Sequence, residues 1–147
     1  MASARSNLNE DITIRGFAVP SADFALNGMF GLTPVWRAPM EAVERVEIIK
    51  GPSAALFGMT PNGSVGGVVN LVPKRAGSEP VSRVAVEASS DSVLGAHADI
   101  GRRFGVDDAF GARLNVMHRE GDTPINAQST RQSLAALGLD FRQRRFR

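Results

Sequence analysis

Apolar residues alternate with polar or small residues along four segments in the second half of the chain. Strict alternation puts every second side chain on the same face of an extended segment. The pattern therefore predicts four antiparallel strands in a sheet with one apolar face and one polar, small or charged face. The apolar positions are residues 84, 86 and 88, then 94, 96, 98 and 100, then 110, 112, 114 and 116, and finally 135, 137, 139 and 141.

These strands fit two kinds of sheet. Lengths of about nine to eleven residues suit strands that cross a bilayer at a tilt, with the apolar face toward lipid. The tight connection at 105–109 and the longer polar one at 120–131 are typical of outer-membrane barrels, although the short connection at 89–93 is not. In a barrel, the residues facing the lumen would be His97, Asp99, Arg113, Asn115 and Asp140. A soluble antiparallel sandwich shows the same alternation, and the alternation alone favours the sandwich.

The first half of the chain predicts shorter strands and a small helical segment. Residues 12–17 and 25–29 are expected to form two short strands. Residues 40–45 fit one or two helical turns, in which Glu41 and Arg45 stand four residues apart, in the favourable order for an ion pair. A solvated surface position is the commoner role of such a pair.

A glycine-rich turn joins two longer strand patterns in residues 43–75. Gly51 and Pro52 break the first pattern, and Pro73 stops a second, β-branched run at 65–72. The turn lacks both the Gly-Lys-Ser/Thr ending and the G-x-G-x-x-G spacing of phosphate-binding loops. It is therefore expected to be a rigid support or a ligand-facing loop. The glycines expected at positive-φ or close-approach positions are Gly58, Gly63, Gly66 and Gly67.

The same run resembles the plug domain of TonB-dependent outer-membrane receptors, especially those that import ferric siderophores. V-E-I-I-K-G-P at 46–52, L-F-G at 56–58 and G-G-V-V-N-L-V-P-K-R at 66–75 occur in the family's order. Upstream, I-T-I-R-G-F at 12–17 and L-N-G-M at 26–29 resemble two further family motifs. Several motifs in order make this a specific signal.

The resemblance implies a mainly β protein with two parts. Residues 1–78 would form a small α+β plug domain that lacks its N-terminal part. Residues 79–147 would form the first antiparallel strands of a transmembrane β-barrel of about 22 strands, truncated here because four strands cannot close. The expected location is the bacterial outer membrane. No signal peptide precedes the plug motifs, so the chain is expected to be a truncated piece of a longer receptor.

The resemblance also implies ligand-contacting residues. Arg15 and Phe57 match family positions that contribute to the siderophore site, and a guanidinium suits an anionic or oxygen-rich chelate. A salt bridge is an equal alternative for Arg15, and packing within the plug is favoured slightly for Phe57. A second loop offers three more candidates, with core packing equally open: Met29, Phe30 and Trp36.

Four charged residues are expected to contact charges on the plug or the barrel wall. They are Glu47, Lys50, Lys74 and Arg75. Lys50 stands where the family usually has arginine, and lysine keeps the charge without the bidentate fork. An ion pair of the family's kind at Lys50 is therefore in doubt.

Composition argues against catalysis and nucleic-acid binding. The chain has no cysteine, two histidines and a formal net charge of +2. His97 and His118 lie in strand patterns without a nucleophile motif or carboxylates at ligand spacing, so neither an enzyme site nor a metal site is expected. The basic residues 142–147 alternate with phenylalanine, which favours a strand or turn over a nucleic-acid contact. No cofactor is expected.

The sequence thus predicts a TonB-dependent receptor and transporter for ferric siderophores. Its expected partners are the ferric siderophore, the TonB complex of the inner membrane and outer-membrane lipid, although residues 1–11 contain no match to a TonB box. Two alternatives stay open. One is a receptor of the same architecture for cobalamin or another metal chelate. The other is a non-functional, soluble, β-rich truncated product.

Overall fold

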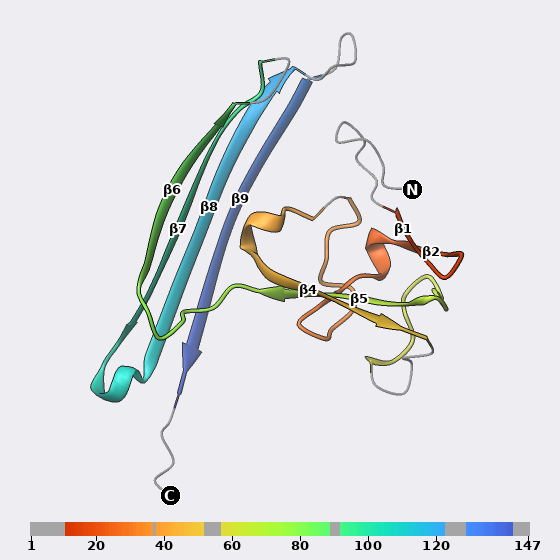
Figure 1. Cartoon of the computed structure of the whole chain (residues 1–147), viewed down its shortest axis with the longest axis horizontal. Coiled ribbons are helices and arrows are strands. Elements are labelled where there is room, and N and C mark those ends of the chain that lie inside the picture. The colour runs from red at the N-terminus through yellow and green to blue at the C-terminus, as the bar shows by residue number, and fades with distance from the viewer. Residues whose placement is uncertain (1–10, 37, 52–56, 89–91, 123–128, 143–147) are drawn as a thin grey trace, which may run out of the picture. The chain divides into compact units, whose positions relative to one another are not determined.

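The structure is a computed structural model that describes residues 11–36, 38–51, 57–88, 92–122 and 129–142 (Figure 1). The chain divides into two compact units, Met1–Pro73 and Lys74–Arg147. The division falls somewhat before residue 78, where the sequence places the domain boundary. Within the described residues, no helix has both the length and the apolar character needed to cross a membrane.

Unit 1 begins with a β-hairpin. Strand β1 (Asp11–Ile14) pairs antiparallel with β2 (Phe17–Pro20). Between them, Arg15 has φ 52° and Gly16 has φ 86°. Two successive positive φ values match the tight turns that follow the right-handed twist of a hairpin. The prediction of a single strand over 12–17 is therefore wrong, because the chain reverses direction in its middle.

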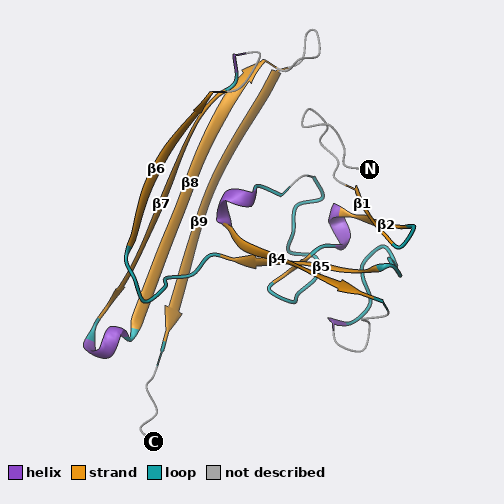
Figure 2. Ribbon diagram, viewed as in Figure 1, coloured by secondary structure: helices purple, strands orange, loops and turns teal. Residues whose placement is uncertain are grey.

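A three-stranded sheet follows, in the order β3-β5-β4. Its two longer strands, β4 and β5, are labelled in Figure 2. The central strand β5 (Gly67–Pro73) pairs parallel with β3 (Ala25–Leu26) and antiparallel with β4 (Val43–Lys50). The two strands expected on either side of the glycine-rich turn are thus confirmed. β3 is shorter than expected, because Asn27 and Gly28 both take positive φ and return the chain to pair Met29 with Leu26.

Unit 1 also contains two 3-10 turns. η1 (Ser21–Asp23) follows β2, and η2 (Met40–Ala42) precedes β4. η2 is the whole of the helical segment expected at 40–45, because β4 begins at Val43. Arg45 therefore lies in a strand, where its Nε donates to Glu47 at 2.8 Å, and it does not form the predicted helical pair with Glu41.

The core of unit 1 lies where the hairpin, η1 and β5 meet. Its buried side chains are apolar: Ile14, Val19, Phe24, Ala38, Val69 and Leu71. Two of them come from the middle of β5, which is covered on both faces like the central strands of buried sheets.

Unit 2 contains one antiparallel sheet in the order β6-β7-β8-β9. Its strands are β6 (Val81–Ala88), β7 (Leu94–Phe104), β8 (Phe110–Asp122) and β9 (Ser129–Phe141), with the 3-10 turn η4 (Val106–Asp108) between β7 and β8. The four predicted antiparallel strands are confirmed.

The two faces of this sheet differ as the alternation predicts. On one face, the side chains of Val84 and Val86 are 78% and 80% exposed. On the other, Asp99 and Asn115 lie directly opposite each other and are 1% and 2% exposed. Charged and polar groups inside with apolar groups outside is the arrangement of strands that face lipid.

Candidate functional site

Arg15 projects from the turn of the β1–β2 hairpin and is exposed. The hairpin packs against the start of β5 at Gly66. A Cβ there would lie 2.7 Å from the carbonyl oxygen of Ile14 and 2.9 Å from Cβ of Phe17. Only glycine allows this approach. Gly58, Gly63 and Gly67 have positive φ, so the predicted role of all four glycines is confirmed.

Phe57 lies beside the turn that carries Met29. A Cβ on Gly28 would meet Cε1 of Phe57 at 3.8 Å, so the half-buried ring covers that turn. The turn is fixed from the other side, because the Gly28 N–H donates to Oδ1 of Asn70 at 2.8 Å. Met29, the residue after Gly28, is 55% exposed. Of the predicted ligand residues, Met29 thus lies in this turn, and Phe57, from a separate segment, lies beside it.

Trp36 lies in a different segment, whose backbone is held on η1. Ser21 Oγ donates to the carbonyl oxygen of Val35 at 2.5 Å, and Thr33 Oγ1 donates to the carbonyl oxygen of Phe24 at 3.0 Å. The Trp36 side chain is 56% exposed, while Phe30 is half-buried. Arg15, Phe57 and Trp36 therefore project from three segments of unit 1.

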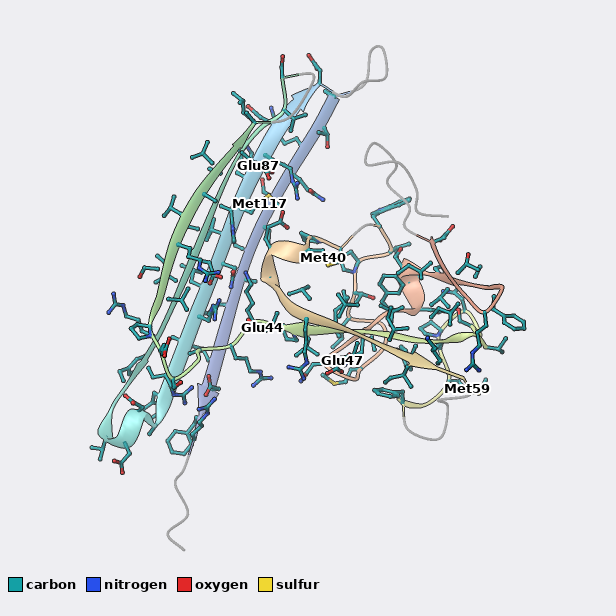
Figure 3. All side chains as sticks on the ribbon, viewed as in Figure 1. Met40, Glu44, Glu47, Met59, Glu87 and Met117 are labelled. Atoms are coloured by element: carbon teal, nitrogen blue, oxygen red, sulfur yellow. The ribbon has the colours of Figure 1, made fainter. Side chains whose placement is uncertain are left out.

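Glu47, labelled in Figure 3, is a residue of β4. It takes part in a polar network within the β3-β5-β4 sheet. Its carboxylate accepts from Nδ2 of Asn70 and from Nε of Arg45, both at 2.8 Å. The hydrogen bond from Asn70 and then the one from Arg45 lower the pKa of Glu47, against a smaller opposing effect of burial. Asn70 joins this carboxylate to the Gly28 turn. Lys50, at the end of β4, is exposed.

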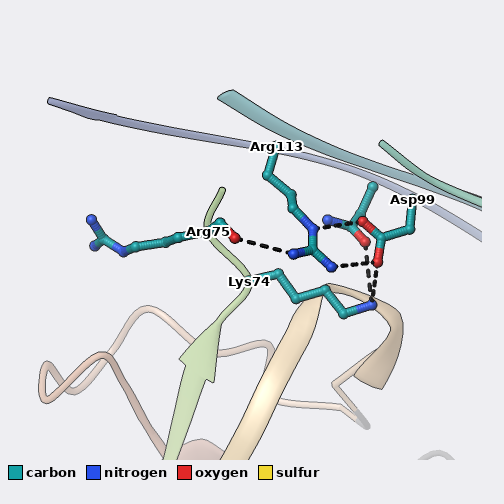
Figure 4. A network of polar contacts seen from close by, with 5 residues as sticks. Lys74, Arg75, Asp99 and Arg113 are labelled. Carbon is teal, nitrogen blue, oxygen red and sulfur yellow. Dashed lines mark hydrogen bonds and ion pairs between the residues drawn. The ribbon is translucent and has the colours of Figure 1, made fainter. Parts of the chain in front are cut away.

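Lys74 takes part in a buried charge network of unit 2 (Figure 4). Its Nζ lies 2.9 Å from Oδ2 of Asp99 and 3.4 Å from Oδ1 of Asn115. Arg113 forms a bidentate pair with Asp99 at 2.7 and 2.8 Å, and its Nη1 donates to the carbonyl oxygen of Arg75 at 3.1 Å. Arg75 takes part through its backbone, while the residue is exposed.

A second arginine–aspartate pair holds the next residue of the same segment. Arg103 Nη1 lies 2.8 Å from Oδ2 of Asp140 and donates to the carbonyl oxygen of Ala76 at 3.0 Å. Gly111 leaves the space these groups occupy, because a Cβ there would lie 2.6 Å from Nη1 of Arg103. Asp140 was among the predicted inner-face residues, but Arg103 was not. Arg103 is four residues after Asp99 in β7, and alternation puts both side chains on the same face. That spacing was the signal in the sequence that could have identified Arg103.

Asp23 is a buried acidic residue of unit 1 that the sequence did not single out. Its fully buried carboxylate accepts hydrogen bonds from Asn62 and Ser64. Burial alone would raise the pKa of Asp23, but the hydrogen bonds from Ser64 and Asn62 bring that pKa below its ordinary value. A single aspartate between apolar residues gives no signal of such partners in the sequence.

The described residues offer little for metal chemistry. They contain no group of three or more histidine, cysteine, aspartate or glutamate side chains that would hold a metal ion. His97 is opposite Met117 on the inner face, whereas His118 is opposite Ala96 on the outer face and lies 2.8 Å from Ser133 Oγ. Because the two histidines lie on opposite faces of the sheet, they do not form a shared ligand pair.

Comparisons with known proteins identify the architecture. The family model of the TonB-dependent receptor plug domain matches residues 1–68. The ferrichrome receptor FcuA of Yersinia enterocolitica is 44% identical over 142 residues, which cover 96% of this chain and 19% of that protein. The crystal structure of BauA, the ferric preacinetobactin receptor of Acinetobacter baumannii, superposes with a TM-score of 0.91 at 48% identity, covering 96% of this chain and 21% of that one.

A third relative is the ferrichrome outer membrane transporter and phage receptor of Escherichia coli K12. It is 32% identical over 124 residues, covering 80% of this chain and 16% of that protein. The chain thus spans about a fifth of the length of the relatives it matches. The matches run through both the plug and the strands that follow it, and they show that the chain belongs to the TonB-dependent outer-membrane receptors.

Proposed function

We propose that this chain supplies the plug and the first barrel strands of a receptor that imports a ferric siderophore across the outer membrane. The main support is the similarity to BauA, which continues from the plug into the antiparallel sheet at 48% identity. The 44% identity to a ferrichrome receptor over 96% of the chain supports the same substrate class.

The proposed ligand contacts are Arg15, Phe57, Met29, Phe30 and Trp36. An exposed guanidinium can donate to the oxygen atoms of a ferric chelate. Exposed aromatic and methionine side chains provide apolar contact with little loss of conformational freedom. The exposure of Arg15, Met29 and Trp36 leaves these three side chains accessible for such contacts.

The proposed partners are those of an energised outer-membrane importer. The TonB complex would supply energy from the inner membrane, and lipid would cover the apolar face of the β6–β9 sheet. Neither a resident cofactor nor an enzymatic step is part of the proposal. Glu47, Lys50, Lys74 and Arg75 are proposed to hold the plug to the barrel wall, and the buried network of Lys74 supports a structural role for that residue.

A graft into a characterised receptor tests the proposed function. The 142 matching residues of FcuA would be replaced by those of this chain, and the hybrid would be expressed in a host without its own siderophore receptors. We expect uptake of ⁵⁵Fe-labelled ferrichrome that disappears when the host lacks TonB. A hybrid that reaches the cell surface but binds none of ferrichrome, ferric preacinetobactin and cyanocobalamin would contradict the proposal. Uptake of cyanocobalamin alone would assign the chain to another substrate class.

A further inference from the structure

The 3-10 turn η1 holds two loops of unit 1 through two different side chains. The first loop is residues 31–36, and the second loop is residues 57–65. Asp23 receives the second loop. Oδ1 of Asp23 accepts from the backbone N–H of Asn62 at 2.7 Å and from its Nδ2 at 3.0 Å. Oδ2 accepts from the backbone N–H of Ser64 at 3.2 Å and from the Ser64 hydroxyl.

The first loop is held by the other end of the same turn. Ser21 Oγ donates to the carbonyl oxygen of Val35. Thr33 Oγ1 lies 3.3 Å from the carbonyl oxygen of Ser21 and also donates to the carbonyl oxygen of Phe24. Ser21 and Asp23 are both buried, and the Phe24 N–H closes the turn by donating to the Ser21 carbonyl oxygen at 3.1 Å. Because only Ala22 separates Ser21 from Asp23, the two loops are connected through a single turn of backbone.

The chemistry of Asp23 suits this position better than any neutral residue would. The second loop presents four donor groups, two of them backbone N–H groups, and an ionised carboxylate accepts at both oxygens. An asparagine offers one acceptor oxygen, and its NH₂ group would face donors. Phe24, the next residue, is part of the apolar core and fixes the turn in place.

Both loops present exposed apolar side chains even though their backbones are fixed. The first loop carries Leu32, Val35 and Trp36, and the second carries Met59 and Val65. Met59 is 83% exposed (Figure 3). Apolar groups that stay exposed on anchored loops are suited to contact a ligand or a partner surface.

We propose that η1 is a positioning element that couples these two loops. Asp23 fixes the position of the second loop, and Ser21 fixes the position of the first. A ligand that contacts one loop then changes the position or mobility of the other. The part that concerns ligand binding rests on the proposed function. The coupling between the loops does not.

The coupling is tested on the ligand-free chain in detergent micelles. Trp36 is the only tryptophan of the chain, so its emission and its quenching by acrylamide report on the first loop. Hydrogen exchange of peptides covering residues 57–65 reports on the second. We expect Asp23→Asn to shift Trp36 emission to the red and raise its quenching constant, and Ser21→Ala to accelerate exchange in the second loop.

Two further variants keep this test decisive. Ser64→Ala removes one donor from Asp23 and is the milder change if Asp23→Asn does not fold. Asp11→Asn is the matched control, because it makes the same chemical change at an exposed position of β1. The coupling is overturned if folded Asp23→Asn or Ser64→Ala alters exchange in the second loop while Trp36 quenching stays at the Asp11→Asn level.

Ferrichrome binding by the FcuA hybrid tests the ligand part separately. We expect Asp23→Asn and Ser21→Ala each to weaken binding by about tenfold, the effect of one hydrogen bond lost between a displaced loop and the ligand. Unchanged affinity in both variants would overturn the ligand part. The two parts can also separate. If the ligand-free chain shows the loop coupling but the hybrid binds no ferrichrome, the proposed substrate is rejected and the positioning role of η1 is supported.

Discussion

In unit 1 the buried side chains are mostly apolar, whereas the strands of unit 2 bury charges and expose their apolar residues. Phe24, Val69 and Leu71 form the centre of the first unit. In the second, Asp99 and Arg113 are among the least exposed side chains. One chain therefore follows two opposite patterns, and the change occurs within a few residues of Pro73.

The difference shows what each unit needs from its surroundings. An apolar core removes its surface from water by itself, so unit 1 has the usual source of stability of a globular domain. The exposed apolar face of unit 2 gains nothing in water, and in the proposed receptor it would be covered by lipid. Besides its backbone ladders, unit 2 buries hydrogen-bonded ion pairs, and such a pair is costly to break when one partner is removed.

Loss of one partner in the buried network is the largest effect we expect. Arg113→Ala leaves Asp99 without its bidentate partner and should lower the free energy of unfolding by about 3–5 kcal/mol. Guanidinium chloride unfolding in micelles, followed by far-ultraviolet circular dichroism, measures it. Arg102→Ala, the same change at an exposed neighbouring position of β7, is the control. Equal stability of the two variants would contradict the dependence of unit 2 on its ion pairs.

The same leucine-to-alanine change in each unit distinguishes a buried apolar core from an exposed apolar face. Leu71→Ala opens a cavity in the apolar core of unit 1 and should cost about 2–5 kcal/mol. Leu137→Ala changes the outer face of β9, which contacts detergent, and should cost about 0.5 kcal/mol or less. Unfolding followed by Trp36 emission reports on unit 1, and circular dichroism reports on both. Similar losses for the two variants would show that the outer face packs against protein.

The sequence predicts unit 2 better than unit 1 for a physical reason. Alternation with a period of two is sustained over long strands, so it identifies β7, β8 and β9 and the residues on each face. The β1–β2 hairpin was missed because its turn places Arg15 at positive φ, a conformation that arginine seldom adopts. The role of Asp23 depends on partners 39 and 41 residues away, which no local pattern contains.

The smallest expected effect is a dependence of unit 1 on acid. The hydrogen bonds from Ser64 and Asn62 outweigh burial and hold the pKa of Asp23 below its ordinary value of 3.8, so folding favours the ionised carboxylate. Its contribution to stability is present above about pH 4 and is lost as the pH falls through the folded-state pKa. Glu47 contributes with the same sign, since its pKa is also lowered.

Unfolding of the wild type and of Asp23→Asn, followed by Trp36 emission at pH 5 and pH 3, isolates the part due to Asp23. We expect the wild type to lose more stability than the variant over this interval, because the asparagine has no proton to gain. Parallel losses would mean that the carboxylate is no more stabilised in the folded chain than in the unfolded one, and that the second loop is held by its neutral contacts alone.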